Sequence, residues 1–191
     1  MEALRLLPQM PSGKTINAYV ISLSTKHSNI LKMINDSITL TETEKDDLNA
    51  FFQFQLDEEA IYLAAFTPKD PNDKTAYIEK YTKHLADPTI NMQTIKVNNE
   101  IAGSIAKFVR EGEAEITYWI DKKFWGKGVA TTALKKFLTT ENTRPIFGRV
   151  AFDNFGSQKV LEKSGFIKVG TDKGFANARQ AEIEEFIYKL N

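Results

Sequence analysis

The chain has 191 residues, of which 42% are hydrophobic and 26% charged, proportions typical of a globular protein rather than a disordered one. Lysine plus arginine number 25, as do aspartate plus glutamate, so the chain lacks the basic field that general nucleic-acid binding requires. The absence of cysteine excludes disulfides, a thiol nucleophile and a cysteine-ligated metal. His27 and His84 are far apart in the sequence. We therefore expect no metal and no nucleic-acid partner.

The sequence gives no indication of a membrane location. It has no run of about 18 apolar residues. Its first residues, MEALRLLPQMPSGK, have too short an apolar region and too early an acid for a signal peptide. We therefore expect a cytoplasmic protein with no membrane partner.

The first 36 residues form a segment of unclear role. Prolines and a glycine between residues 8 and 13 mark a loop, residues 16–23 have strand-like composition, and residues 29–35 are compatible with a short helix. We interpret residues 1–36 as an N-terminal extension. It either packs against the main domain, residues 37–191, as an edge strand, or serves as a homodimer contact or a lid over the substrate cleft.

One strand and three helices are predicted next. Residues 38–41 alternate as a strand does. Thr43, followed by a run of acids, predicts the start of a helix whose apolar residues recur at helical spacing until the helix ends near Asp57. Two further helices are expected over residues 58–65 and 73–86, with two prolines in the break between them.

Three strands should then form an antiparallel meander, over residues 91–97, 101–109 and 114–120. Gly103 lies inside the second strand, which suggests either a β-bulge or a close approach of another backbone. The third strand leads into a short basic loop that ends in Gly126-Lys127-Gly128.

The glycine turn stands between the strand over 114–120 and a helix predicted over 129–140 from its apolar face. Backbone N–H groups in the first turn of a helix have no intrahelical partner, and glycine lets a ligand approach the main chain. This order therefore predicts a site for phosphate. A Walker-type P-loop is excluded because Asp121 stands where that motif has its first glycine. A dinucleotide fingerprint is weak because Thr131 replaces its third glycine.

The last part of the chain continues with a strand over 146–152 and a helix that opens at Asn154 and stops at Ser164-Gly165. Two final strands, over 166–169 and 183–190, are expected on either side of a glycine-bearing loop over 170–174. The sum is a mixed sheet flanked by helices on both faces, a three-layer α/β/α domain.

Two motifs carry a resemblance to a known family. Residues 123–128, KFWGKG, resemble the pyrophosphate loop of the GNAT acyltransferase superfamily, Arg/Gln-x-x-Gly-x-Gly/Ala, with lysine in the first position. Residues 154–166, NFGSQKVLEKSGF, resemble that superfamily's Asn-x-x-Ser-x-x-(Val/Leu)-Leu-Glu-Lys-x-Gly-Phe signature. The resemblance covers residues 38–190 and is to the branch with ribosomal-protein acetyltransferases. It implies the GNAT fold, with a mixed, mostly antiparallel central sheet.

The resemblance implies acetyl-CoA (CoA) as co-substrate, with no metal. Backbone N–H groups of the loop and the first helical turn would bind the pyrophosphate, and the end of the preceding strand would pair with the pantetheine arm. For Asn154 the alternative is helix capping, and for Ser157 it is a solvated helix surface. The implied cofactor-binding residues are Trp119, Ile120, Lys123, Phe124, Trp125, Gly126, Lys127, Gly128, Val129, Ala130, Thr131, Asn154 and Ser157.

The implied reaction is direct attack of an amine on the thioester, with a backbone N–H near Trp119 stabilising the oxyanion. Glu115 is the best candidate for general base, because strand alternation places it on one face with Trp119. The alternative is an exposed strand carboxylate without a role. Many members of the superfamily have a tyrosine as general acid where this chain has Leu161, so the acid is Ser157, Tyr118 or water.

We therefore expect an acetyl-CoA-dependent N-acetyltransferase that acts on a primary amine of a small molecule or peptide. A longer acyl chain and an alcohol acceptor are variants of this activity. A catalytically weak CoA-binding regulatory or scaffolding domain and a nucleotide-binding enzyme are the alternatives from other classes. The acids Asp57 to Glu59 are expected to cap a helix, with binding of a cationic amine as the alternative.

Overall fold

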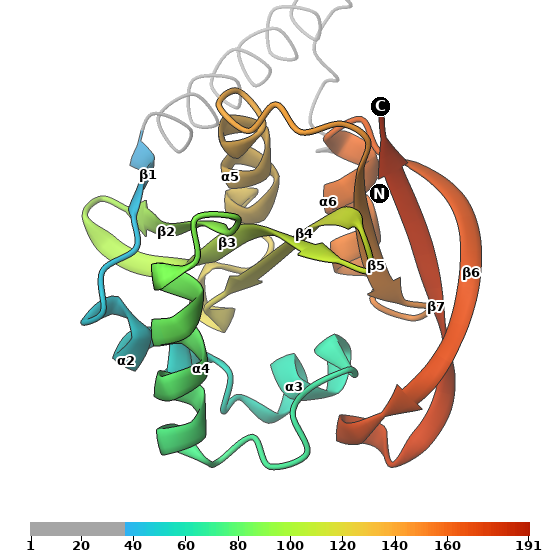
Figure 1. Ribbon diagram of the computed structural model, residues 1–191, viewed down its shortest axis with the longest axis horizontal. Coiled ribbons are helices and arrows are strands. Elements are labelled where there is room, and N and C mark those ends of the chain that lie inside the picture. Colours follow the sequence, from blue (N-terminus) through green and yellow to red (C-terminus); the bar gives the residue numbers. More distant parts are fainter. Residues whose placement is uncertain (1–36) are drawn as a thin grey trace, which may run out of the picture. The chain divides into compact units, whose positions relative to one another are not determined.

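The computed structural model describes residues 37–191, and the predicted extension, with its expected strand, helix and dimer or lid role, lies outside the described residues. The elements carry the labels of Figure 1. In chain order they are β1 (Ile38–Glu42), α2 (Asp47–Phe54), α3 (Glu58–Ala64), α4 (Lys74–Ala86), β2 (Asn91–Val97), β3 (Glu100–Arg110), β4 (Glu113–Ile120), the 3-10 helix η1 (Lys122–Phe124), α5 (Val129–Phe137), β5 (Ile146–Ala151), α6 (Phe155–Lys163), β6 (Ile167–Ala176), η2 (Asn177–Arg179) and β7 (Ala181–Leu190).

The strands form a seven-stranded sheet in the order β1-β2-β3-β4-β5-β7-β6. Only β4 and β5 run parallel, and every other neighbouring pair is antiparallel, which confirms the mixed, mostly antiparallel sheet. Within residues 37–191, no helix is both long enough and apolar enough to cross a membrane.

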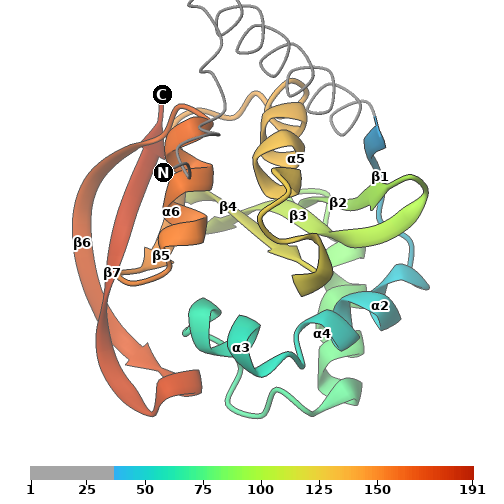
Figure 2. The same cartoon turned by 180° about the vertical axis from the view of Figure 1, so that it is seen from behind.

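Helices cover both faces of this sheet, with α5 and α6 on one face and α2, α3 and α4 on the other (Figures 1 and 2). On the first face, Leu161 of α6 lies so close to Gly148 of β5 that a Cβ there would stand 2.9 Å from its Cδ2. On the second face, Leu48 and Phe51 of α2 pack against Met92 of β2, with side chains of α4 around them. The three-layer prediction is confirmed.

Gly103 shows both features that its place in a strand suggested. The register of β2 and β3 shifts between Ile95 and Lys96, which leaves Ala102 as the extra residue of a bulge. A Cβ on Gly103 would stand 2.0 Å from the carbonyl oxygen of Trp119, so only glycine fits there. The bulge and the close approach bring β3 against the end of β4 that leads to the glycine turn.

The parallel strands β4 and β5 are paired only at their beginnings. Ala114 lies opposite Ile146 and Glu115 opposite Phe147, and no later residue of β4 pairs with β5 among the described residues. The rest of β4 therefore has one edge bonded to β3 and the other edge open. The two strands thus separate toward the end of β4, which leaves there the free edge that pairing with a pantetheine arm requires.

The prediction for the start of α2 is wrong. The helix begins at Asp47 rather than just after Thr43, and it ends at Phe54 rather than near Asp57. Thr43 is buried, and its hydroxyl lies 3.2 Å from that of Thr94, which donates to Asp47 Oδ2 at 2.6 Å. Thr43 therefore joins the sheet to the helix side chains, because its hydroxyl is directed at β2 instead of a helical N–H.

The prediction of a loop over residues 170–174 is also wrong. β6 runs without interruption from Ile167 to Ala176, curving along the edge of the sheet, and the connection to β7 is η2 (Figure 1). β6 is an edge strand, so most of its side chains are exposed and no apolar alternation marks it. Its glycine at 170 lies at a shift in register after Lys168, and so marks an irregularity inside a strand.

Candidate functional site

A cleft of about 850 Å³ lies between the α2–α3–α4 layer and the sheet, and it extends to the beginnings of α5 and α6. Most of the predicted site residues meet in this cleft. Lys123 and Lys127 are not among the residues that line it. The predicted site residues that line the cleft are Glu115, Tyr118, Trp119, Ile120, Phe124, Trp125, Gly126, Gly128, Val129, Ala130, Thr131, Asn154 and Ser157.

The glycine turn has the geometry of an anion site. Gly126 and Gly128 have φ values of 70° and 78°, and Gly128 is the N-cap residue of α5 without a side-chain cap bond. The first-turn N–H groups of Val129, Ala130 and Thr131 have no intrahelical acceptor, since the intrahelical bonds begin at a later residue. A Cβ on either glycine would meet nothing within 4 Å, so the space in front of these donors is open. A diphosphate fits this turn.

Side-chain contacts with the end of β4 determine the path of the loop. Asp121 accepts from the N–H of Lys123 at 3.2 Å, which caps η1. The indole of Trp125 donates to the carbonyl of Ile120 at 2.8 Å, and Phe124 is buried beneath the turn. Trp125 and Phe124 therefore hold the turn in place from inside the protein, and they contribute to the site by this support.

The register of β3 and β4 decides which main-chain groups of β4 face the open edge. Asp121 N–H donates to the carbonyl of Ala102 at 2.8 Å, and main-chain groups alternate in direction along an antiparallel pair. Trp119 therefore directs its N–H and C=O toward β3, whereas Tyr118 and Ile120 direct theirs toward the open edge. The register therefore favours Tyr118 and the N–H of Ile120 over Trp119 for main-chain pairing with a ligand, because the Ile120 carbonyl already accepts from the Trp125 indole.

Tyr118 and Ser157, two predicted candidates for the acid, touch each other. Their hydroxyl oxygens are 2.7 Å apart, and Tyr118 OH also lies 3.2 Å from the Ser157 carbonyl. Burial raises the pKa of the Tyr118 phenol, and the Ser157 contact opposes that effect without cancelling it. The phenol is therefore protonated near neutral pH and able to donate. Leu161, at the position of the family's tyrosine, is a buried apolar residue.

Asn154 is engaged on both sides of its amide. Its Oδ1 accepts from the N–H of Ser157 at 3.0 Å, and its Nδ2 donates to the carbonyl of Leu63 in α3 at 3.0 Å. The capping interpretation of Asn154 is confirmed. The second bond, which no sequence pattern indicated, ties the beginning of α6 to the helix on the other side of the cleft.

Glu115 is buried, with 5% of its surface exposed, so the interpretation as an exposed strand carboxylate is wrong. Its Oε1 lies 2.9 Å from Arg110 Nη2 and 3.1 Å from Arg149 Nε. Burial raises the pKa of the Glu115 carboxyl, and the guanidinium groups of Arg110 and Arg149 oppose that rise. The result is a carboxyl with a pKa above the usual range for glutamate, as a general base requires.

Two lysines just before the glycine turn are paired with acids. Lys123 Nζ lies 2.5 Å from Glu100, and Lys122 Nζ lies 2.8 Å from Glu59 and 3.3 Å from Asp57. Asp57 also caps α3 by accepting from the N–H of Ala60 at 2.9 Å, which confirms the capping interpretation for Asp57, while Glu58 and Glu59 lie in the first turn of the helix. Because the Lys123 ammonium is held by Glu100, the first-turn N–H groups of α5 are better placed than Lys123 to bind an anion.

Aromatic side chains from both the sheet and the helices line the cleft. Trp119 contributes its indole from the sheet, and the indole Nε1 is buried without a partner among residues 37–191. Trp119 lies on the same face of β4 as Glu115. An acceptor bound beside these aromatic side chains would therefore be on the side of the sheet that carries the Glu115 carboxyl. The other aromatic residues that line the cleft are Phe51, Phe54, Phe66, Tyr77, Tyr81, Phe108, Tyr118, Phe124, Trp125 and Phe155.

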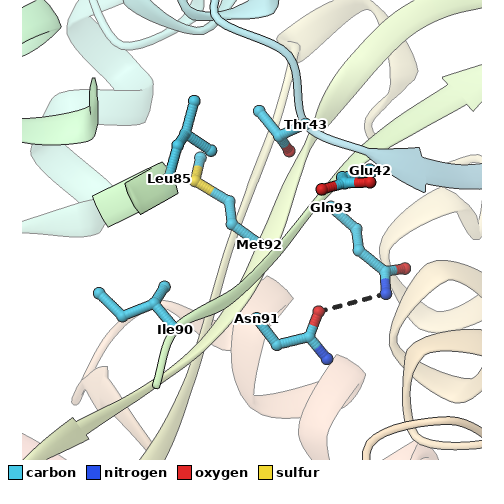
Figure 3. A pocket seen from close by; sticks show the side chains of 7 residues that line it. All are labelled: Glu42, Thr43, Leu85, Ile90, Asn91, Met92 and Gln93. Carbon is cyan, nitrogen blue, oxygen red and sulfur yellow. Dashed lines mark hydrogen bonds between the residues drawn. The ribbon is translucent and has the colours of Figure 1, made fainter. Parts of the chain in front are cut away.

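A second pocket of about 300 Å³ lies where β1 and β2 meet the end of α4, and none of the predicted site residues lines it (Figure 3). The Gln93 amide donates to Asn91 Oδ1 at 3.3 Å within it. Leu85, Ile90 and Met92 form its apolar side. It includes neither the glycine turn nor any residue of β4, and we assign the site to the larger cleft.

Comparisons with known proteins agree with this geometry. A family model described as an acetyltransferase (GNAT) domain matches residues 37–167. The N-acetyltransferase p20 of Bacillus licheniformis, itself uncharacterized, is 25% identical over 168 residues, which cover 83% of this chain and 94% of that protein.

Solved structures agree as well. The microcin C7 self-immunity acetyltransferase MccE, in complex with acetyl-CoA and AMP, has a TM-score of 0.69 at 20% identity and covers 82% of this chain and 93% of its own. The ribosomal L7/L12 alpha-N-protein acetyltransferase RimL, in complex with CoA, has a TM-score of 0.71 at 19% identity and covers 81% and 93%.

At these identities, the two solved structures establish the likeness of the fold. The family match spans the sheet from β1 to β5, the glycine turn and α6. The resemblance found in the two motifs is confirmed: the chain belongs to the GNAT acetyltransferase family and is an acyltransferase.

Proposed function

We propose that this protein is an acetyl-CoA-dependent N-acetyltransferase that transfers the acetyl group directly to a primary amine of a small molecule or peptide. The observation that carries the proposal is the glycine turn at the start of α5, whose free N–H groups lie beside the open edge of β4. A diphosphate at the turn and an extended amide chain along the edge are complementary to these two features.

The N–H groups of Val129, Ala130 and Thr131 would bind the pyrophosphate, with the dipole of α5 adding to the attraction. The main-chain groups of Tyr118 and the N–H of Ile120 would pair with the amides of the pantetheine arm as an added strand does, since the Ile120 carbonyl already accepts from the Trp125 indole. Acetyl-CoA supplies an acetyl group activated as a thioester. An N–H on this edge would stabilise the oxyanion that forms at the thioester carbonyl.

Glu115 would accept the proton that the amine loses. Along β4 its Cα is about 13 Å from that of Trp119, at a strand rise of about 3.3 Å per residue. An amine in contact with a thioester at the end of β4 is therefore beyond direct reach of the carboxylate, and water carries the proton between them. Most of the rate gain would come from holding the two reactants in position.

Tyr118 would supply the proton to the leaving thiolate, with Ser157 as its hydrogen-bonded neighbour. The hydroxyl contact at 2.7 Å supports this role, because a phenol held at the open edge is near the end of an extended ligand arm. The interpretation as a catalytically weak CoA-binding domain rested on the missing tyrosine at Leu161. A phenol from β4 against the same helix weakens that argument.

The experiment is release of free thiol from acetyl-CoA over a panel of amines: an alanine-terminated peptide, spermidine and single amino acids. We expect thiol release that depends on one class of amine, together with an acetylated product of the corresponding mass. Tight binding of CoA without turnover of any amine in the panel would contradict the proposal and favour the binding domain.

A further inference from the structure

A network of charged side chains surrounds Glu115 and crosses five strands. We call it the charge network: Arg110 of β3, Glu115 of β4, Arg149 of β5, Asp172 of β6 and Glu185 of β7. Arg149 is its centre. Its Nε lies 3.1 Å from Glu115 Oε1, and its Nη1 lies 3.1 Å from Glu185 and 3.3 Å from Asp172.

The two arginines make their closest contacts with the same oxygen of Glu115. Arg110 Nη2 and Arg149 Nε both lie within 3.1 Å of Oε1. The other oxygen, Oε2, accepts no hydrogen bond within residues 37–191. The two oxygens therefore differ: Oε1 is the oxygen closest to both guanidinium groups, and Oε2 can still accept a hydrogen bond from a ligand or water in the cleft that Glu115 lines.

Arg149 is better placed than Arg110 to hold the carboxylate. The Arg149 side chain is 18% exposed and has three carboxylate partners, whereas the Arg110 side chain is 48% exposed and has one. Exposed single pairs contribute little, while a desolvated arginine bonded on several sides has little freedom to move. Asp172 and Glu185 therefore orient Arg149, and Arg149 orients Glu115.

We propose that Arg149 is a positioning residue that binds Oε1 of Glu115 and thereby presents Oε2 as the oxygen that receives the proton of the acceptor amine. This inference rests on the proposed function, in which Glu115 is the general base. Arg149 does not touch the reacting atoms in this scheme; it acts through the carboxylate.

The proton balance is simple. The ammonium form of the acceptor gives one proton, through water, to Glu115 Oε2, and the free amine then attacks the thioester carbon. The C–S bond breaks as the C–N bond remains, and CoA leaves as a thiolate that takes a proton from Tyr118 or water. The second proton on nitrogen leaves for solvent, and the proton on Glu115 passes through water to the group that protonated the thiolate, so both groups are restored and the sum is amide, CoA thiol and one released proton.

Charges on every neighbouring strand affect the titration of Glu115. The guanidinium groups of Arg110 and Arg149 favour its ionised form, and the carboxylate of Glu185 disfavours it, with burial raising the pKa overall. Asp172 reaches Glu115 only through Arg149, and Lys80 of α4 lines the same cleft. Removing Arg149 should therefore raise the pKa of Glu115, and neutralising Glu185 should lower it.

The test compares four variants of the full chain: Arg149→Met, Arg149→Lys, Glu185→Gln and, as a control, Arg144→Met, an exposed arginine that bonds only loop carbonyls among the described residues. Two readouts are used. One is the titration of the Glu115 carboxyl by carbon NMR of glutamate-labelled protein, with the Glu115→Gln spectrum identifying the signal. The other is the pH profile of kcat/KM with the amine of the panel that releases most thiol.

In Arg149→Met, we expect the acid limb of the kcat/KM profile to move to higher pH by about one pH unit or more, the usual effect of removing an adjacent opposite charge. In Glu185→Gln, the same limb should move to lower pH. Arg149→Lys should keep the limb near its wild-type position, because lysine keeps the charge. It should lower kcat several-fold, because lysine lacks the planar set of guanidinium N–H donors that holds the carboxylates in place. Arg144→Met should match wild type. If Arg149→Met does not fold, the other two substitutions decide.

An unchanged Glu115 titration in Arg149→Met, or equal kcat in wild type and Arg149→Lys, would overturn the role of Arg149. A titration that moves while the activity profile stays fixed would also overturn it, since the proton then goes elsewhere. If wild type acetylates no amine, the proposed function fails by its own test. The NMR titration alone then decides whether Arg149 controls the carboxyl.

Discussion

Two glycines in the turn before α5 carry the binding of the co-substrate, and the chain offers a third as a control. Gly112, in the turn between β3 and β4, has a φ of 85° and the same open surroundings as Gly126 and Gly128. A substitution at any of the three costs similar backbone strain, of about 1 kcal/mol. Only a substitution at the α5 turn would place a side chain in the space for the pyrophosphate.

We predict that Gly128→Asp lowers CoA affinity at least about 100-fold, because an anion would occupy the position of another anion at the helix N-terminus. Gly112→Asp should bind CoA as wild type does. Isothermal titration with CoA measures both, and thermal unfolding of each variant shows that the fold is kept. Equal CoA affinities for Gly128→Asp and Gly112→Asp would show that the turn before α5 is not part of the CoA-binding site.

Glu115 gives the second prediction at this scale. In Glu115→Gln, the acid limb of the kcat/KM profile should disappear and the rate at neutral pH should fall by about 100-fold, a typical contribution of a general base. Because the wild-type pKa is raised by burial, the limb should lie above the usual range for glutamate, with activity lost as pH falls through it. A limb that survives in Glu115→Gln would belong to another group, and Arg144→Met provides the matched control.

The residues found from the sequence and those missed differ in a physical way. Glu115 and Tyr118 belong to a local pattern, since alternation along one strand separates their faces without knowledge of any partner. Arg149 lies 34 positions after Glu115, and only the parallel pairing of β4 and β5 brings them together. No periodicity within a segment encodes which strands are neighbours, so the charge network was not predictable.

Among the elements, α3 depends most on its neighbours. It has seven residues, of which only Ala60 is buried, and an isolated helix of this length is not stable. Arg179 of η2 donates to the carbonyl of Tyr62 at 3.0 Å, stacks over the Tyr62 ring and pairs with Asp153 at 2.7 Å. Together with the bond from Asn154 to Leu63, these contacts hold α3 as a wall of the cleft.

We predict that Arg179→Ala lowers the free energy of unfolding by about 1–3 kcal/mol, because the Asp153 carboxylate and a helix carbonyl lose a charged donor. Arg179 holds the pKa of Asp153 below its usual range. The stabilisation is therefore present above the unfolded pKa of about 4 and is lost as pH falls through the lower folded value. Urea unfolding at several pH values should show the wild-type advantage shrinking in acid.

A wild-type advantage in that comparison that stayed constant as pH fell would assign the loss to the Tyr62 contacts alone. A matched control is Arg144→Ala, which removes an exposed arginine with carbonyl contacts only in its own loop among the described residues. Raised KM for the acceptor with unchanged CoA affinity in Arg179→Ala would further show that α3 forms the acceptor wall.

Element prediction succeeded where a local signal existed and failed where it did not. The beginnings of α3 and α4 follow from the caps Asp57 and Asp73, each of which accepts a hydrogen bond from a residue of the first turn. The prediction ended β6 at residue 169, too early, because an edge strand that is exposed over most of its length has no apolar alternation to detect. Thr43 is a residue type that often caps helices, but its hydroxyl bonds to Thr94, a residue distant in the sequence, and not to a helical N–H.

For the whole molecule, the arrangement of the cleft predicts which ligands stabilise the fold. A diphosphate with an amide-containing arm can use both the α5 turn and the open edge of β4, whereas ATP or NAD can use only the turn. The described fold also has one parallel strand pair, β4 and β5, and its separation supplies the edge. Stabilisation by CoA should therefore exceed that by nucleotides at equal concentration.

We predict that CoA at about 100 times its dissociation constant raises the free energy of unfolding by about 2.7 kcal/mol, by mass action on the folded state. ATP and NAD at the same concentration should leave the melting temperature nearly unchanged. Thermal unfolding with each ligand measures this, and Gly128→Asp should abolish the response to CoA. Stabilisation by ATP or NAD where CoA has no effect would favour a nucleotide-binding enzyme, because the open edge of β4 would then contribute nothing to recognition.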